Sequence, residues 1–297
     1  MKKIRKAVLP AAGFGTRFLP QTKAMPKEML PVLDKPVLQF IVEEMANSGI
    51  TEIIFVTSSQ KRAIEDHFDR DYDFEAYLKS VGKYDMIKPL VELSKKVRFF
   101  YTRQAKPTGN GDALLCARQF LGDEPFAFSD GDSIIDAKVP VVKQMIKVFE
   151  QLNAPVIGVQ KISDKNEMMK YGNVFGEKIK DLRLKTGNHN LQSSILNLDS
   201  RIYKIKKFIE KPNIRNVSPD GLIIGGMRYI FTKDIWPILL KQKPSRSGEV
   251  WVSDSANTLA KQQPFYAYEY EGRYFDTGNK VSLLKTALYF AEKEKLI

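Results

Sequence analysis

Cysteine and histidine are almost absent from this chain of 297 residues, which contains one cysteine and two histidines. Cys116 has no second cysteine with which to form an internal disulfide. Together with His67 and His189 it cannot supply the usual ligand set of a zinc site. The sequence therefore excludes a disulfide-stapled fold and a zinc-based fold, and a reducing cytoplasm is the expected setting.

Long apolar runs are also missing, since none approaches the roughly 18 residues that would span a bilayer. The N-terminal sequence MKKIRKAVLPAAG superficially resembles a signal peptide, but Pro10 cuts its apolar run short and Arg17 soon follows. We interpret this segment as the first strand and expect no membrane association. With 43% hydrophobic residues, the chain can bury the core of one large domain.

Positive charge is plentiful: 47 basic and 35 acidic residues give a formal charge of +12. Basic proteins often bind nucleic acid, but here the charge is dispersed, without a helix-turn-helix, zinc-finger or aromatic RNA-binding signature. We expect no specific nucleic-acid partner. A basic surface that attracts small phosphorylated substrates is the milder explanation.

Strands and helices alternate along the first 160 residues, which favours a mostly parallel sheet with helices on both faces. Strands are expected at Lys6–Pro10, Glu52–Thr57, Val97–Arg103, Pro125–Phe128 and Ala154–Val159, and helices at Lys35–Ser48, Lys61–Phe68, Asp112–Leu121 and Val139–Leu152. A helical excursion is expected at Asp69–Lys96, further strands at Tyr203–Ile209 and Leu222–Phe231, and helices that pack back on the sheet at Asp234–Leu240, Ser253–Gln262 and Lys280–Lys295. Ligands of such sheets bind at the carboxyl ends of the strands.

The loop after the first strand is the most informative segment, because glycines and cations follow each other there. Gly13 and Gly15 allow close approach of backbone N–H groups to phosphate. The pattern is neither a dinucleotide fingerprint nor a P-loop. Three cations, Arg17, Lys23 and Lys27, follow Thr16. They supply positive charge of the kind that phosphoryl transfer requires. The loop therefore predicts a nucleoside triphosphate site.

Five other segments carry candidate ligands, and the residues alone leave their roles open. The turn Asp130–Ser133 could bind a metal or be an ordinary turn. Asp276 could bind a metal or cap the following helix. Gln104, Tyr171 and the Glu210-Lys211 pair could contact a substrate or belong to surface turns.

A specific resemblance covers nearly the whole chain. GFGTRFLPQTKAMPKEMLPVLDKP, from Gly13 onward, is similar to the signature of bacterial UTP–glucose-1-phosphate uridylyltransferases, within the sugar-1-phosphate nucleotidylyltransferase family. The segments RQAKPTGNGDALLCARQFLGDEPFAF, KYGNV, FIEKP and YFDTGNK follow in the order of that family. The resemblance implies a nucleotidyltransferase (glycosyltransferase-A-like) fold, with a Rossmann-like, mostly parallel mixed sheet flanked by helices.

The resemblance also implies a role for each matching residue. Nucleotide binding is expected at Ala11, Ala12, Gly13, Gly15, Thr16, Arg17, Glu28, Gln104, Pro107, Gly109 and Asp132. Sugar-phosphate binding is expected at Tyr171, Gly172, Glu210 and Lys211, Mg²⁺ binding at Asp132 and Asp276, and catalysis at Arg17, Lys27 and Lys211.

Three positions depart from the family pattern. Asp112 replaces the histidine of Gly-His-Ala and is expected to be the N-cap of a helix. Ser133 replaces the second aspartate of Gly-Asp-Asp, while Asp130 adds a carboxylate nearby. Trp251 stands where a glutamine is usual, so sugar choice or subunit contacts are expected to differ there.

The expected reaction is a single in-line displacement, in which a phosphate oxygen of glucose 1-phosphate attacks the α-phosphorus of UTP and expels pyrophosphate. A single domain is expected, with a nucleotide-binding part at about residues 1–160 and a sugar-phosphate part at about 161–297. A homodimer or homotetramer is expected by resemblance. The alternatives are a relative that uses another nucleoside triphosphate or hexose 1-phosphate, and a catalytically silent nucleotide-sugar sensor.

Overall fold

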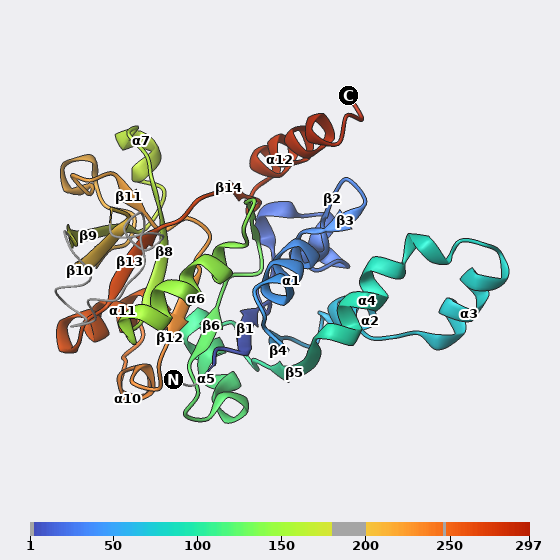
Figure 1. The fold of residues 1–297 in the computed structure, drawn as a ribbon, viewed down its shortest axis with the longest axis horizontal. Helices are drawn as coiled ribbons and strands as arrows, with labels where there is room; N and C mark the ends of the chain where they lie inside the picture. The colour runs from blue at the N-terminus through green and yellow to red at the C-terminus, as the bar shows by residue number, and fades with distance from the viewer. Residues whose placement is uncertain (1–2, 180–199, 246–247) are drawn as a thin grey trace.

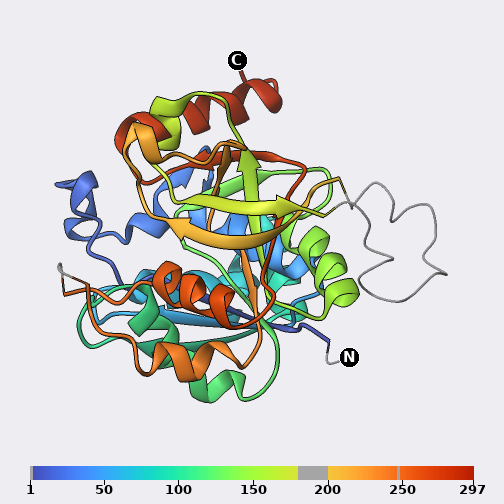
Figure 2. The ribbon, with the colours of Figure 1, turned by 90° about the vertical axis from the view of Figure 1, so that its left-hand side faces the viewer.

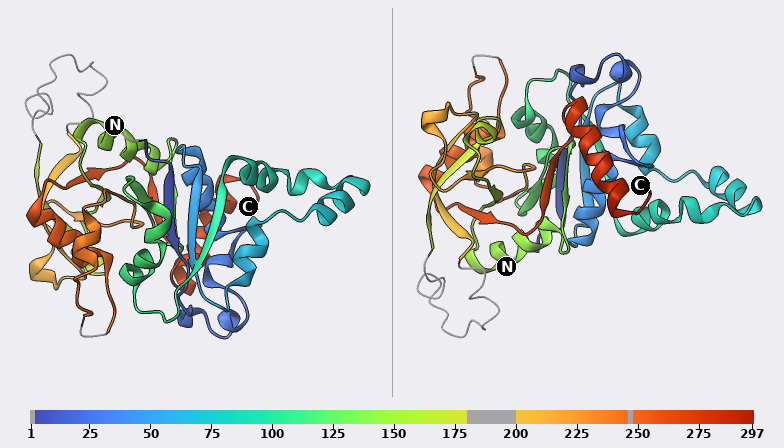
Figure 3. Two further views of the ribbon diagram at one scale, coloured as in Figure 1. Left: turned by 90° about the horizontal axis from the view of Figure 1, so that it is seen from below. Right: turned by 90° about the horizontal axis from the view of Figure 1, so that it is seen from above.

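The computed structural model describes residues 3–179, 200–245 and 248–297 (Figure 1). His189 lies outside these ranges. Within them, one large mixed sheet runs through the molecule and carries helices on both faces (Figures 1 and 3). The predicted α/β fold class is confirmed.

The main sheet has ten strands in the described residues. Their spatial order is β11 (Leu222–Ile223), β9 (Asn173–Lys178), β10 (Ile202–Ile209), β13 (Tyr266–Glu269), β8 (Val156–Lys161), β12 (Tyr229–Phe231), β6 (Phe126–Phe128), β1 (Lys6–Pro10), β4 (Glu52–Thr57) and β5 (Arg98–Arg103). Two small sheets pair β14 (Arg273–Asp276) with β7 (Ser133–Asp136), and β2 (Pro31–Val32) with β3 (Lys35–Pro36).

The two halves of the sheet differ in strand direction. Strands β6, β1, β4 and β5 are parallel, so their carboxyl ends lie at one edge. Among the described strands of the other half, β8 and β13 are the only parallel neighbours, and Figure 2 shows β9 and β10 side by side with opposite directions. The parallel half matches the βαβ alternation of the early sequence.

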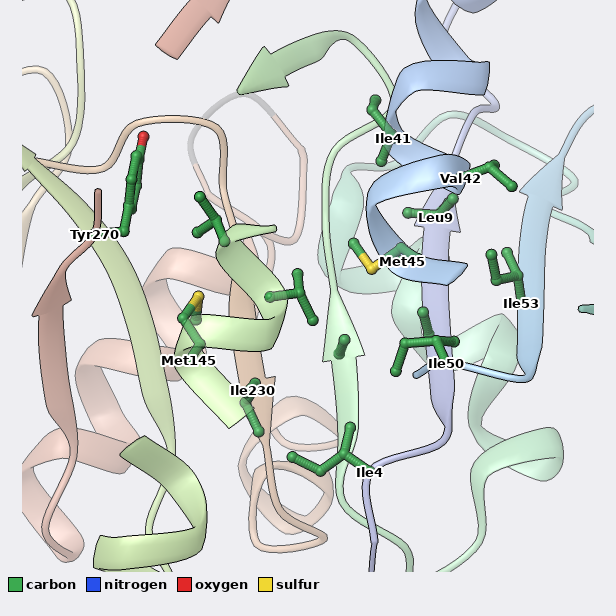
Figure 4. Close-up of a cluster of buried hydrophobic side chains, with 14 of the residues drawn as sticks. Ile4, Leu9, Ile41, Val42, Met45, Ile50, Ile53, Met145, Ile230 and Tyr270 are labelled. Atoms are coloured by element: carbon green, nitrogen blue, oxygen red, sulfur yellow. The ribbon is translucent and has the colours of Figure 1, made fainter. Parts of the chain in front are cut away.

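Helices cover the sheet according to the alternation of its side chains. Ala7 and Leu9 of β1 point into a core with α1 (Val37–Asn47) and α6 (Val141–Leu152), whereas Val8 points into a second core on the opposite face. Figure 4 shows the first core, where Leu9, Met45 and Ile53 approach one another. The second core is covered by α5 (Asn110–Leu121), α10 (Ile235–Leu239) and α11 (Val252–Gln262).

The predicted helical excursion is confirmed. Helices α3 (Tyr72–Ser80) and α4 (Lys88–Lys96) follow α2 (Arg62–Phe68) and extend away from the rest of the molecule (Figures 1 and 3). The short helix α7 (Lys165–Met168) lies at the opposite end. The strands and helices expected in residues 6–68 and 97–161 are present, with boundaries that differ by about three residues at most.

Two expectations about the later part of the chain are wrong. The strand expected at Leu222–Phe231 is divided into β11 and β12, because Gly226 and Met227 adopt left-handed backbone conformations between them. Helix α12 (Lys280–Lys293) packs on β14 and β2 instead of the main sheet, and its Phe290 contacts Phe40 and Phe275.

A buried arginine connects three elements at the centre of the molecule. The Arg228 side chain is fully buried, and its Nη2 lies 2.7 Å from Oε2 of Glu44 on α1. Its Nη1 donates to Asp130 Oδ1 at 3.3 Å and to Ser133 Oγ at 3.1 Å. The arginine therefore joins β12 to α1 and to the turn between β6 and β7.

Membrane insertion through a helix finds no support in the described ranges, where every helix is too short or too polar to cross a bilayer.

Replacing Arg228 with methionine should leave two carboxylates buried without their cation. We expect Arg228→Met to lower the free energy of unfolding by about 3–5 kcal/mol. Urea denaturation followed by circular dichroism would measure the change. The control is Arg62→Met, which removes a highly exposed ion pair with Asp66 and should cost less than about 1 kcal/mol. Equal costs for the two variants would contradict the prediction.

Candidate active site

A cavity of about 400 Å³ lies where loops from both halves of the sheet meet. It is bordered by the loop after β1, the turn between β6 and β7, the segments before β9 and after β10, and the segment between β14 and α12. Its lining consists of Gly15, Thr16, Arg17, Phe18, Lys27, Asp130, Asp132, Lys170, Tyr171, Gly172, Glu210, Lys211, Ile224, Gly226, Met227, Tyr229, Trp251, Ser253, Tyr274, Asp276 and Gly278.

The loop after β1 folds back on itself so that Arg17 and Lys27 face the cavity. Gly15 has a φ of 67°, and a Cβ at this position would lie 3.0 Å from the Cβ of Lys27. Its carbonyl accepts a hydrogen bond of 2.7 Å from Thr22. Glycine is therefore needed at position 15 both for conformation and for close packing. Gly13 meets neither condition, since its φ is not positive and its nearest neighbour in the Cβ direction is 3.9 Å away.

Lys27 forms an ion pair with a carboxylate of the cavity. Its Nζ lies 2.5 Å from Oδ2 of Asp132. Burial lowers the pKa of Lys27, but Asp132 and Glu28 more than offset this and hold that pKa above its usual value. Burial likewise raises the pKa of Asp132, but Lys27 outweighs it, and the pKa of that carboxyl falls below its usual range. Both groups are therefore charged at neutral pH.

Glu28, expected to bind nucleotide, is instead buried behind the loop. Its Oε2 lies 2.8 Å from Nζ of Lys61, and both side chains are almost inaccessible. Lys61 and Glu28 lie 33 residues apart, so no local sequence pattern predicts that they form a pair. The pair anchors the segment that carries Lys27 to the start of α2, which makes Glu28 a supporting residue in this structure.

Asp132 and Asp276 are brought together by the antiparallel pairing of β7 with β14, in which Asp276 lies opposite Ser133, the neighbour of Asp132. The Asp132 carbonyl accepts a 2.7 Å hydrogen bond from the Thr277 hydroxyl. A Cβ at Gly278 would lie 2.9 Å from Asp276 Oδ1 and 3.6 Å from Asp132 Oδ2, so both carboxylates border one small space. Asp276 does not cap α12, because Asn279 does so.

Asp130 belongs to the same turn but has a different partner. It accepts hydrogen bonds from Ser133 and from Arg228. Burial and the neighbouring Asp132 raise the pKa of Asp130 to about 6, against the opposing effect of Arg228. The serine at the family's aspartate position thus contacts the added carboxylate directly.

The far side of the cavity carries the residues expected to bind sugar phosphate. Gly172 packs against Glu210, since a Cβ at position 172 would lie 2.9 Å from Glu210 Oε2 and equally close to Ile224 Cδ1. Burial raises the pKa of Glu210, and the neighbouring Lys211 opposes that shift. Tyr171 lies edge-on to Tyr274, with ring centroids 5.8 Å apart. An acceptor, a cation and two aromatic rings therefore share one wall.

Charge within the cavity is balanced. The cationic lining residues are Arg17, Lys27, Lys170 and Lys211, and the carboxylates are Asp130, Asp132, Glu210 and Asp276. Two phosphorylated substrates would add a large negative charge, which a divalent cation would offset. No cluster of three or more histidine, cysteine or acidic residues that could hold a metal occurs in residues 3–179, 200–245 and 248–297. A metal here would need oxygen ligands from the substrates, as Mg²⁺ commonly takes.

The expected base-binding loop borders the cavity without lining it. Gln104 is buried and follows β5, where its N–H donates to Thr57 in continuation of the sheet. Gly109 precedes α5, and a Cβ there would lie 2.4 Å from the Val250 carbonyl. Close chain packing thus requires this glycine. The expectation that Asp112 caps α5 is wrong, because Gly109 occupies the N-cap position and the Asp112 carboxylate bonds Gln104 and Thr108.

The structure thus gathers most, but not all, of the expected residues around the cavity. Those outside its lining are Ala11, Ala12, Gly13, Glu28, Gln104, Pro107 and Gly109, together with the exposed Lys23. Sequence reasoning did not assign Lys170, Tyr274 or Ser253 to a site, although two of them stand in or beside the quoted motifs. The apolar lining residues Ile224 and Met227 carry no signal that would distinguish them from core residues.

Comparisons with known proteins agree on one family. The family model described as nucleotidyl transferase matches residues 6–293. The chain is 42% identical over 295 residues to UTP–glucose-1-phosphate uridylyltransferase 2 of Staphylococcus saprophyticus, covering 99% of this chain and 94% of the relative. It is 41% identical, with the same coverage, to UTP–glucose-1-phosphate uridylyltransferase of Bacillus subtilis.

A solved structure supports the same assignment. A UDP-glucose pyrophosphorylase in complex with UDP-glucose superimposes with a TM-score of 0.83 at 32% identity, covering 98% of this chain and 99% of the other. With its fold, its cavity and these relatives in agreement, the chain belongs to the nucleotidyl transferase family.

Proposed function

We propose that this enzyme transfers UMP from UTP to glucose 1-phosphate, giving UDP-glucose and pyrophosphate. The observation that carries the proposal is the meeting of three groups in one cavity: cations of the loop after β1, carboxylates of the turn before β7 and of β14, and the Glu210-Lys211 pair. The relatives that are named for this reaction align with the chain over nearly its full length.

The reaction is an in-line displacement in which the substrate supplies the nucleophile. Lys211 holds the phosphate of glucose 1-phosphate, whose oxygen attacks the α-phosphorus of UTP. Arg17 and Lys27 hold the triphosphate and stabilise the charge that moves to the leaving pyrophosphate. The bond to the β-phosphate oxygen breaks as the new bond to the sugar phosphate forms. Positioning and fixed charge suffice, and no covalent enzyme intermediate is needed.

Asp132 and Asp276 are the proposed residues for Mg²⁺. Their carboxylates border one space, and a hard divalent cation prefers such oxygen ligands. When bound, Mg²⁺ supplies positive charge beside the phosphates. Lys27, whose Nζ lies 2.5 Å from Oδ2 of Asp132, would stand beside both the metal and the phosphates.

Glu210 is placed to accept hydrogen bonds from sugar hydroxyls, with Tyr171 and Gly172 beside the ring. The backbone of the loop after β1, from Ala11 to Thr16, and the loop with Gln104, Pro107 and Gly109 would hold the nucleotide. One domain, a cytoplasmic setting and a homodimer or homotetramer complete the proposal.

The test is pyrophosphate release with UTP and glucose 1-phosphate, with and without Mg²⁺, beside dTTP and galactose 1-phosphate. Metal-dependent release that prefers UTP and glucose 1-phosphate supports the proposal. Preference for a control substrate would move the specificity to another nucleotide or hexose. Binding of UDP-glucose without any release would favour the sensor.

Removing the Lys27 ammonium should affect catalysis far more than folding. We expect Lys27→Met to lower kcat at least about 100-fold, because a charge on the transferring phosphoryl group is lost. Its partner Asp132 is partly exposed, so the free energy of unfolding should change by only about 1 kcal/mol. Steady-state kinetics and urea denaturation measure the two effects. Lys143→Met, at an exposed position of α6, is the control, and unchanged turnover in Lys27→Met would remove Lys27 from the mechanism.

Removing one carboxylate should weaken metal binding. We expect Asp276→Asn to raise the Mg²⁺ concentration for half-maximal activity by roughly tenfold or more, and excess chelator to stop wild-type turnover. Asp136→Asn is the matched control, since Asp136 lies on β7 but pairs with Lys293 outside the cavity. A chelator-resistant wild type, or equal metal requirements in the two variants, would exclude the assignment.

A methyl group at Gly172 should displace the Glu210 carboxylate. We expect Gly172→Ala to raise KM for glucose 1-phosphate by roughly tenfold, because small misplacements of a positioning group are costly. KM for UTP should change little, which provides the internal control. If KM rises equally for glucose 1-phosphate and for UTP, the contact of Glu210 is not specific to the sugar phosphate.

A further inference from the structure

We propose that Asp112 positions the Gln104 amide so that only its carbonyl oxygen is available to a nucleobase. Asp112 would then be a determinant of the preference for uracil over cytosine. The inference deepens the proposed function and rests on it for the placement of the base near Gln104. Asp112 itself acts through Gln104 and is a positioning residue.

Both N–H groups of Gln104 already have partners. Nε2 donates to Oδ2 of Asp112 at 2.7 Å and to the carbonyl oxygen of Gly109 at 3.0 Å. An amide nitrogen has two hydrogens, so its donor capacity is used. The Oε1 atom accepts no hydrogen bond within the described ranges, and it is not among the buried polar atoms that lack a partner there. Oε1 is therefore the group of this amide that is left to accept a hydrogen bond.

The orientation of this amide follows from its neighbours. A carboxylate and a backbone carbonyl can only accept hydrogen bonds. If the amide were turned over, Oε1 would face two oxygens at 2.7 and 3.0 Å, which is repulsive. The Gly109 carbonyl accepts from one N–H group of the Gln104 amide, and the Asp112 carboxylate accepts from the other.

Asp112 is itself held firmly. The Thr108 hydroxyl donates to the same Oδ2 atom at 2.7 Å. Asp112 lies in the first turn of α5, where the helix dipole favours a negative charge. The carboxylate thus has two donors and a favourable field, and its bonds to the loop give Gln104 one orientation.

The loop that carries these residues is joined to the wall of the cavity. The Val250 N–H donates to the Thr108 carbonyl at 2.8 Å, and the Gly111 N–H donates to the Val250 carbonyl at 2.8 Å. The next residue, Trp251, lines the cavity. A base that extends from a triphosphate in the cavity toward this loop would meet Gln104.

An acceptor at this point distinguishes the pyrimidines by ring nitrogen N3. Uracil and thymine carry an N–H donor there, whereas N3 of cytosine is an acceptor and would face Oε1 without a hydrogen. A buried or partly buried mismatch of two acceptors is costly. The Asp112–Gln104 pair should therefore separate uracil from cytosine, but not uracil from thymine.

The experiment measures dissociation constants of UTP, CTP and dTTP by calorimetry, together with turnover, for wild type, Asp112→Ala and Asp112→Asn. We expect Asp112→Ala to lower the preference for UTP over CTP by about tenfold, because Gln104 can then present either group. The ratio of UTP to dTTP should stay at its wild-type value. Asp112→Asn, whose amide oxygen can still accept from Gln104, should retain more of the preference.

Two controls separate positioning from a structural role. Asp123→Asn changes another aspartate just beyond the end of α5, where it pairs with Lys233 on the surface, and should leave both ratios unchanged. In a Gln104→Ala background, Asp112→Ala should have no further effect on the ratio of UTP to CTP, because Asp112 acts through Gln104.

Each outcome decides the inference. An unchanged ratio of UTP to CTP in Asp112→Ala, an equal fall in the ratios of UTP to CTP and of UTP to dTTP, or an effect that persists without Gln104 would overturn it. Asp112→Asn keeps the test valid if the alanine variant folds poorly. A wild type that binds UTP but releases no pyrophosphate would refute the proposed reaction while the binding ratios still test Asp112.

Discussion

The buried ion pairs of Arg228 determine where the acidic groups of the cavity lie. Desolvating a guanidinium is costly, and the cost is offset only because Glu44, Asp130 and Ser133 surround it with acceptors. These contacts fix the turn between β6 and β7 against α1. The same turn presents Asp132. The strand that starts at Ser133 pairs with β14, which presents Asp276. The proposed metal ligands thus depend on a residue that does not bind the metal.

Positive and negative side chains balance one another within the cavity. Lys27 pairs with Asp132, so neither charge is left alone in a partly buried space. Substrates would exchange this pair for contacts with phosphate and metal. The Lys61–Glu28 pair behind it involves no cavity group and can remain intact during the exchange. A rigid pair behind a replaceable one is suited to repeated turnover.

Local sequence patterns predicted most of the fold, and tertiary pairing accounts for what they missed. Short continuous apolar runs located β1 and β4, because a strand buried on both faces requires apolar residues at successive positions. The division of β11 from β12 depends on left-handed backbone at Gly226 and Met227, and periodicity does not report it. Among the candidate site residues, Gly15, Lys27 and Asp132 reach the cavity as predicted, since each follows a strand of the parallel half. The partners of Glu28 and Asp112 could not be predicted, because Lys61 is distant in sequence and a helix-start aspartate usually caps its own helix.

The acidic turn of this chain is held by charge contacts with Arg228. Ser133 replaces a carboxylate of the family pattern, and Asp130 adds one three residues earlier. Both side chains contact Nη1 of Arg228 and each other. Asp130 is therefore the second acidic partner of the guanidinium, beside Glu44. Because Asp130 is engaged there, Asp132 and Asp276 are the carboxylates left to face the phosphates, and two is the number that Mg²⁺ commonly takes from protein. The substitution at position 133 thus alters how the turn is held without removing the pair of ligands that the proposed reaction needs.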